Sequence, residues 1–188
     1  MKYLLLILSF SAFAADNTIN IQQIGNNNTV AILQDGSGHT STVNLGANSN
    51  VDNTSIYIDQ KDSGIKTTSV EIKSGVNNGI NILQQGAGNH IASIQNLNGS
   101  GNNISISQNG SGNNEFNVIG GAGTTNSGNT INATQSGGAG ADKWFQVNLL
   151  GATGATVNVQ QTNPTQANQA SMNIQCSSNC GSWSYVRN

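Results

Sequence analysis

The fold of this protein is decided by the stretch Asn78-Gly79-Ile80-Asn81-Ile82-Leu83-Gln84. Every second residue of it belongs to one set, Asn, Ile, Ile and Gln, and residues two apart lie on the same face of a β-strand. The stretch therefore predicts a strand with one face that is polar at both ends and apolar in the middle. A Gly-rich segment follows at residues 85–88, as expected for a turn that needs positive φ.

The same frame recurs along the chain, giving thirteen strand units between residues 17 and 176. Alternation alone also fits the hairpins of an antiparallel sandwich. The return of the same residue type at the same place favours stacked parallel rungs, because identical amides can then form ladders along the stack. We therefore predict an all-β fold, an amyloid-like β-solenoid of strand-turn-strand rungs with two units per rung and between six and seven rungs.

The polar positions of the frame are predicted to form amide ladders between rungs. They are Asn17, Gln23, Asn28, Gln34, Gln60, Asn78, Gln84, Asn89, Gln95, Asn102, Gln108, Asn129, Gln135 and Gln161.

The apolar positions of the frame are predicted to form a dry core. They are Ile19, Ile21, Val30, Ile32, Val43, Leu45, Ile56, Ile58, Val70, Ile72, Ile80, Ile82, Ile91, Ile104, Ile106, Phe116, Val118, Ile131, Val147, Val157, Val159, Met172 and Ile174.

The composition excludes several classes of protein. The 188 residues include 31 Asn, 15 Gln and 23 Gly, only 7% are charged, and the formal net charge is −2. Disorder driven by charge repulsion is excluded, as is nucleic-acid binding through phosphate neutralisation. A helical protein is disfavoured because Asn and Gly are poor helix formers. Such a chain either stays disordered or stacks as β-structure.

The N-terminus is typical of a secretory signal peptide. Lys2 precedes an apolar run at residues 3–10, and Ala12-Phe13-Ala14 is a small-x-small cleavage site. The run is far shorter than the ~20 residues that span a bilayer. We predict a signal peptide at 1–14, a repeat solenoid at 15–176 and an aromatic tail at 177–188, with no membrane span in the mature chain.

Two stretches resemble the curlin repeat of bacterial curli fibres, Ser-x5-Gln-x-Gly-x-Gly-Asn-x-Ala-x3-Gln. The two are Asn17-x5-Gln23-x-Gly25-x-Asn27-Asn28-x-Val30-x3-Gln34 and Asn78-x5-Gln84-x-Gly86-x-Gly88-Asn89-x-Ile91-x3-Gln95. Asn replaces the leading Ser of the family pattern, and Val or Ile replaces its Ala. Weaker copies cover nearly the whole mature chain.

The resemblance implies a secreted subunit of functional amyloid in biofilm matrix, polymerised at the bacterial cell surface by solenoid stacking. The implied partners are other copies of the chain, a nucleator subunit and an outer-membrane secretion channel. A lone rung cannot offset the backbone entropy of ordering it, and uncapped rung edges favour end-to-end growth. The alternatives are a minor nucleator or anchor subunit, or a monomeric secreted solenoid that binds carbohydrate or ice.

Chemistry-bearing residues are few, and the sequence predicts no enzyme, cofactor or metal. His39 and His90 occupy or adjoin positions where Asn sits in other units, so we interpret them as turn residues. The segment 137–144 fits one calcium nonapeptide, but a calcium site of that kind needs neighbouring copies, which favours a Gly-rich insertion. Aromatics gather late, at Trp144, Phe145, Trp183 and Tyr185, where they cover an edge or contact polysaccharide.

Cys176 and Cys180 are the only cysteines. An exported protein meets an oxidising compartment, so we predict a disulfide between them. The alternative is a bridge between stacked subunits. We expect Cys176 to occupy the closing, inward position of the thirteenth unit, and the small loop to hold Trp183 and Tyr185 over the last rung.

Overall fold

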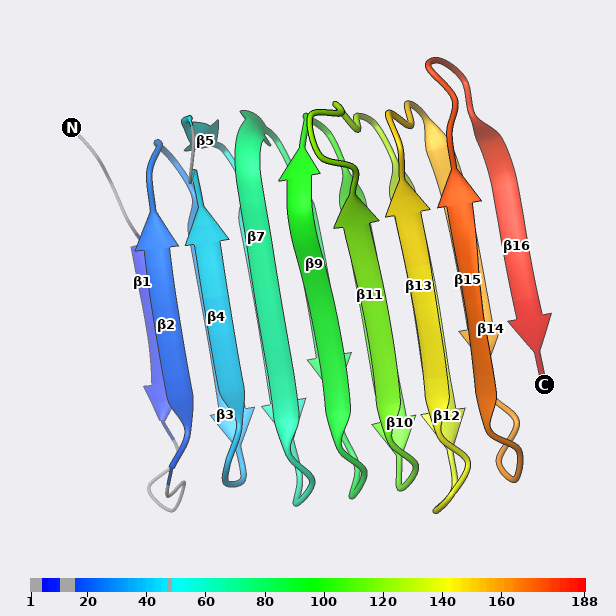
Figure 1. The fold of residues 1–188 in the computed structure, drawn as a ribbon. Coiled ribbons are helices and arrows are strands. Elements are labelled where there is room, and N and C mark those ends of the chain that lie inside the picture. Colours follow the sequence, from blue (N-terminus) through cyan, green and yellow to red (C-terminus); the bar gives the residue numbers. More distant parts are fainter. Residues whose placement is uncertain (1–4, 11–15, 47–48) are drawn as a thin grey trace.

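The computed structural model describes residues 5–10, 16–46 and 49–188, and for residues 5–10 it gives the course of the backbone alone. The described residues form two flat sheets of parallel strands that face each other (Figure 1). The chain crosses from one sheet to the other at every turn and winds about six times, as a β-solenoid. The predicted fold class is confirmed.

We name the two sheets A and B. The strands of sheet A, in spatial order, are β1 (Leu5–Phe10), β3 (Thr29–Asp35), β6 (Ser55–Lys61), β8 (Gly79–Gln84), β10 (Asn103–Gly110), β12 (Thr130–Gly137), β14 (Ala155–Gln161) and β16 (Gly181–Arg187). Those of sheet B are β2 (Thr18–Gln23), β4 (Thr40–Leu45), β7 (Lys66–Val76), β9 (His90–Asn98), β11 (Asn114–Gly120), β13 (Lys143–Leu149) and β15 (Asn168–Ile174), with β5 (Val51–Asp52) beside β7.

Sheet A repeats the same residues from rung to rung. Ile56, Ile80 and Ile104 are direct partners in successive strands, and Ile58 and Ile82 are partners two residues further along. Each of these side chains is at most 4% exposed, because the other sheet covers it. Burying such columns of β-branched side chains between two sheets is what holds the rungs together.

Sheet B has the same path but a more varied interior. Phe116 and Phe145 stack in adjacent strands with ring centroids 5.9 Å apart, and Tyr185 of β16 packs against Phe145 at 4.9 Å. The first strand, β2, contributes Ile19 and Ile21, and the last, β15, contributes Met172. These three are only partly buried because each lies in a terminal rung.

The unit at residues 89–95 corrects the sequence analysis. The structure places Ile91 outward, 41% exposed, while Ala92, Ile94 and Leu97 point into the core. The inward frame is thus shifted by one residue in β9. Beyond Ile94 the pairing with β7 changes register, as in a β-bulge, and brings Leu97 opposite Ile72.

The strand stack also extends on both sides of the thirteen expected units. On the N-terminal side, β1 lies within the expected signal peptide, and its backbone pairs with that of β3. The expected cleavage site at residues 12–14 lies outside the described residues. At the other end β16 pairs with β14 over seven residues and lies within the expected tail at 177–188. None of the described residues belongs to a helix that could cross a membrane.

Candidate functional site

An uninterrupted ladder of glutamine amides runs through sheet A. Each Nε2 donates to the Oε1 of the next rung, at 2.8 Å from Gln34 to Gln60, 2.9 Å from Gln60 to Gln84, and 2.8 Å for each later step through Gln108 and Gln135 to Gln161. All six side chains are buried. The second amide hydrogen of several of them reaches a backbone carbonyl of sheet B, as in the bond from Gln84 to Thr67. The ladder therefore joins rung to rung and sheet to sheet.

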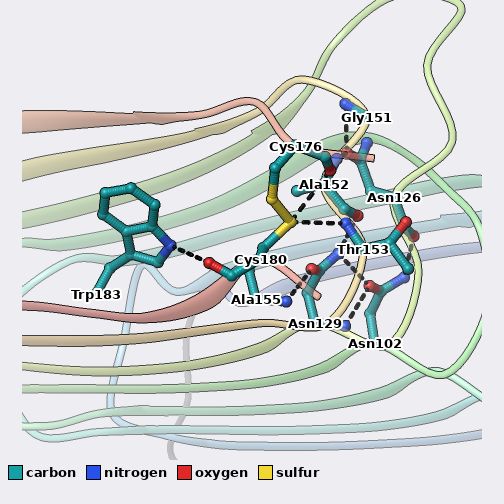
Figure 2. Close-up of a disulfide and its surroundings, with 10 residues drawn as sticks. All are labelled: Asn102, Asn126, Asn129, Gly151, Ala152, Thr153, Ala155, Cys176, Cys180 and Trp183. Atoms are coloured by element: carbon teal, nitrogen blue, oxygen red, sulfur yellow. Dashed lines mark hydrogen bonds between the residues drawn. A yellow bond between two sulfur atoms is a disulfide. The ribbon is translucent and has the colours of Figure 1, made fainter. Parts of the chain in front are cut away.

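A second buried ladder lies at the corner where the chain enters sheet A. Asn102 Oδ1 accepts bonds from the backbone N–H and the side-chain amide of Asn129, and Asn129 Oδ1 accepts from the N–H of Ala155 (Figure 2). Asn78 stands in the same relation to Asn102. Thr54, which the sequence analysis left out of the ladder set, takes the place between Asn28 and Asn78 and donates its backbone N–H to Asn28. The asparagines thus satisfy backbone groups that the tight corner leaves unpaired.

The opposite corner, where the chain enters sheet B, carries buried cations instead of a repeated amide. Its column contains, in order, Asn17, His39, Lys66, His90, Asn114, Lys143 and Asn168. These side chains are buried except for Asn17 and Asn168, which are partly exposed in the terminal rungs. The histidines are therefore inward corner residues.

Lys66 is enclosed by the corner itself. Its Nζ donates to the carbonyls of Gly64 at 2.9 Å, Gly86 at 2.7 Å and Gly88 at 2.9 Å. Lys143 repeats the arrangement with the carbonyls of Ala141, Asn163 and Gln166. Removal from water lowers the pKa of Lys66 to about 8 and also lowers the pKa of Lys143. Each ammonium joins its own turn to the turn of the next rung by satisfying three carbonyls at once.

The histidines of this column are held neutral. His90 Nε2 lies 2.7 Å from the carbonyl of Gln85, and its Nδ1 lies 3.2 Å from the amide nitrogen of Asn114. That arrangement fits one N–H donor and one acceptor nitrogen. Burial, together with the smaller effect of the Lys66 charge one rung away, lowers the pKa of His90 to about 4. Burial also lowers the pKa of His39.

The structure places four of the expected ladder residues outside the two ladders. Asn17 begins the corner column of sheet B, where its Oδ1 accepts the backbone N–H of His39 at 2.8 Å. Gln23 ends a strand of sheet B, in a column continued by Leu45 and Ile72, and its buried Oε1 has no hydrogen-bond partner among the residues that the structure describes. Asn89 and Gln95 are exposed because the frame of β9 is shifted by one residue. Asn89 makes a different inter-rung bond, accepting the N–H of Ile65 at 3.0 Å.

The residues that the sequence analysis missed belong mainly to sheet B. They include Lys66 and Lys143 at the corner and Ala92, Ile94, Leu97, Phe145 and Leu149 in the core, so Phe145 is a core residue and does not cover an edge. The register offers a signal that could have found them, because Lys66, His90 and Asn114 follow one another at intervals of 24 residues. Residue identity differs at every step, so a search for repeated residue types passes over this column.

The last rung departs from the pattern of sheet A. Trp183, Tyr185 and Arg187 lie opposite Val157, Val159 and Gln161, so bulky side chains and a cation replace the usual apolar pair and glutamine. Gln161 accordingly turns to Asn168, with its Nε2 2.7 Å from Oδ1. The glutamine ladder ends here.

A disulfide joins Cys176 and Cys180 at the corner where the asparagine ladder stops (Figure 2). The backbone N–H of Cys180 donates to the carbonyl of Thr153 at 3.1 Å, and the indole of Trp183 donates to the carbonyl of Cys180 at 3.1 Å. The closing inward position of β15 is held by Ile174, and Cys176 lies just beyond the strand, which corrects the place expected for it. The covalent loop fixes the final corner in the absence of an inward asparagine.

The Gly-rich segment before β13 forms the turn that leads into Lys143 and supplies one of its three carbonyl partners, that of Ala141. Asp142 Oδ1 accepts the backbone N–H of Asn113 at 2.8 Å, so the acidic side chain is already used to connect two rungs. Within the described part of the chain, no cluster of three or more His, Cys, Asp or Glu side chains has the geometry to hold a metal ion.

Residues 14–44 match the family model of the curlin associated repeat. The resemblance to that repeat is confirmed. The matched segment spans the first complete rung, β2 and β3, together with most of β4. No curated protein and no solved structure matches the chain.

Proposed function

We propose that this protein is a structural subunit of an extracellular, curli-like amyloid fibre that forms part of the biofilm matrix and serves in surface adhesion. The subunits assemble by end-to-end stacking. The observation that carries the proposal is the glutamine ladder of sheet A, in which every inner amide both donates to one neighbouring rung and accepts from the other. A stack of this kind has no intrinsic end. Its terminal rungs carry the same unpaired backbone groups that the inner rungs satisfy.

The N-terminal end is the better surface for addition of a second copy. Removal of residues 1–14 as a signal peptide takes away β1, so that β3 becomes the edge strand of sheet A, while β2 is already the edge strand of sheet B. The inward residues of β3 are Val30, Ile32 and Gln34, the same kind of set that the other rungs of sheet A present. The inward side chains of a neighbouring subunit would therefore stack on residues of the same kind as their own.

The C-terminal end supports a second candidate function, that of a minor subunit that nucleates or anchors fibres. Trp183, Tyr185 and Arg187 replace the repeated residues there, and a disulfide fixes the adjoining corner. A chain with one repeating and one unique end can start or terminate a fibre as well as extend it. In either role the protein acts structurally, outside the cell, with other copies, a nucleator and a secretion channel as partners.

The test is assembly of the purified chain lacking residues 1–14 after dilution from denaturant. The major-subunit role predicts unbranched, thioflavin-positive fibres that appear after a lag and grow without other components. Seeding of a different curlin-type subunit by substoichiometric amounts, without bulk growth, would favour the nucleator. A soluble monomer that persists for days at micromolar concentration would reject both roles.

A further inference from the structure

The outer face of sheet B carries a groove that the stacking of rungs does not use. It has a volume of about 440 Å³ and crosses β9, β11 and β13 at their N-terminal ends, next to the start of β15. These four strands are neighbours in the sheet (Figure 1). The groove therefore runs along the solenoid axis, perpendicular to the strands.

An in-register row of outward side chains forms its floor. Ile91, Glu115, Trp144 and Gln169 are direct partners in the four strands. Successive strands lie about 4.8 Å apart, so the row offers a contact at each step of that length. Ile91 and the indole of Trp144 supply apolar surface on either side of Glu115.

Hydrogen bonds hold this row in a fixed conformation. Trp144 Nε1 donates to Glu115 Oε1 at 3.1 Å, and Asn117 donates to the same oxygen at 2.7 Å. Both bonds fall on Oε1, which leaves Glu115 Oε2 with no protein donor within the described residues. The indole is thus oriented by its polar edge, while a carboxylate oxygen next to it stays available to a ligand.

The rim above this row is polar and acidic. It contains Asn89, Asn113 and Asp142, which are exposed and connect successive rungs by their side-chain oxygens. Lys143 also lines the groove, but its Nζ is bonded to carbonyls of the corner. The side-chain oxygens of Asn89 and Asn113 already accept backbone N–H groups, so a ligand meets the amide donors of these two residues together with the carboxylate acceptors of Glu115 and Asp142.

We propose that this groove binds an uncharged polysaccharide of hexopyranose units. A pyranose has an apolar face that stacks on an indole and hydroxyl groups that donate to carboxylates and amides. Its repeat along a chain is close to the strand spacing, so successive sugars meet successive side chains of the row. Two acidic side chains disfavour an anionic polymer. Strands β9, β11 and β13 are each paired on both sides, so a peptide strand cannot add to the sheet where they form the groove, and the edge of sheet B lies at β15.

The groove exists within a single chain, so the proposal goes beyond the fibre function and does not require it. In a fibre each subunit would present one such groove on the same face. Weak binding to each site would then be strengthened by multivalency.

The experiment measures binding of cellohexaose to the purified protein by calorimetry, with polygalacturonate as the anionic comparison. We expect Trp144→Ala to weaken cellohexaose binding about tenfold. Tyr57→Ala is the matched control, because Tyr57 is an outward aromatic, 40% exposed, on the other sheet. Tyr57→Ala should change the affinity for cellohexaose by less than about twofold, because a side chain on the other sheet does not contact a ligand in the groove.

Glu115→Gln is a second variant that keeps the shape of the site and an acceptor for the indole. It should weaken binding several-fold because hydroxyl groups bond more strongly to a carboxylate than to an amide. Circular dichroism and thioflavin response, measured on every variant, report folding and assembly separately from sugar binding. Three results would each overturn the proposal, whether or not fibres form. They are no binding of cellohexaose, equal affinity of Trp144→Ala and Tyr57→Ala for it, and tighter binding of polygalacturonate than of cellohexaose. Lateral association of fibres that is lost in Trp144→Ala, without sugar binding, would instead assign the groove to a second copy of the chain.

Discussion

Sheets A and B follow the same path through the solenoid but are built on different principles. Sheet A repeats the residues of each column almost unchanged, ending in the glutamine ladder. Sheet B changes residue type from rung to rung, with buried lysines, histidines and a pair of stacked phenylalanines. The difference matters for the register of stacking. If the strands shifted by one whole rung, identical columns would still pair like residues, whereas columns of unlike residues would lose their partners.

The comparison suggests a division of roles between the sheets. The repeated columns of sheet A offer each rung the same partners, which suits both stability and continuation into a further subunit. The unlike columns of sheet B fix which rung lies on which. Lys66 illustrates this, since its three carbonyl partners come from its own turn and from the turn of one particular neighbouring rung.

The largest contrast is expected between two isoleucines. Ile82→Ala in sheet A opens a cavity in the core and should lower the free energy of unfolding by about 2–5 kcal/mol. Ile91→Ala removes an outward side chain of sheet B and should change it by less than about 0.5 kcal/mol. Chemical denaturation of freshly refolded protein measures both. Similar losses for the two variants would mean that the frame of β9 is not shifted.

The histidines of sheet B predict a pH dependence that sheet A lacks. The pKa of His90 falls from 6.5 in the unfolded chain to about 4 in the fold, so the unfolded chain binds more protons between these values. The free energy of unfolding should therefore decrease as the pH falls from 6.5 towards 4, by up to about 3 kcal/mol.

Denaturation curves of His90→Asn at several pH values test this, because Asn occupies the same column in other rungs. The variant should lose most of the decrease, while His39→Asn, the matched control, should keep the part that His90 contributes. A wild-type stability that stays constant between pH 6.5 and 4.5 would contradict the neutral, buried state of His90.

The ladder of sheet A predicts a difference between adjacent glutamines. Gln84→Ala leaves the amide of Gln60 and the carbonyl of Gln108 unpaired, at a cost of about 1–3 kcal/mol. Gln85→Ala changes a residue outside the ladder. The measurement is unfolding midpoint together with fibrillation lag time, and the lag should lengthen for Gln84→Ala alone. Equal lag times would show that the ladder does not contribute to assembly.

The smallest effect is expected at the last corner, where the two sheets end. Replacing both cysteines by serine opens a short loop, so the loss of stability should be well below the ~3 kcal/mol associated with a 15-residue loop. Limited proteolysis should nevertheless become faster within β16, because the disulfide fixes the turn that leads into it. Mass spectrometry of the unreduced protein provides the control, with the intramolecular bridge giving a monomer lighter by two hydrogens. Free thiols or a covalent dimer would reject the assignment.

The sequence by itself determined the all-β solenoid and the inward residues of sheet A from β3 to β14. It could do so because a period of two within each strand and a repeated set of residues between strands are both visible in one dimension. Ile80, Ile82 and Gln84 share a face for the first reason, and their partners in the next rung carry the same names for the second.

Only the tertiary structure decided how sheet B is filled. Ile91 and Ala92 are neighbours in a plausible strand, and which of them points inward depends on the register set by β7 and β11. Lys66 and Lys143 look like surface residues in the sequence. A cation becomes tolerable in the interior only when the turns of two neighbouring rungs together supply three carbonyls to it, and the sequence does not show which turns meet. The groove at Trp144 likewise exists only where four strands, distant in sequence, lie side by side.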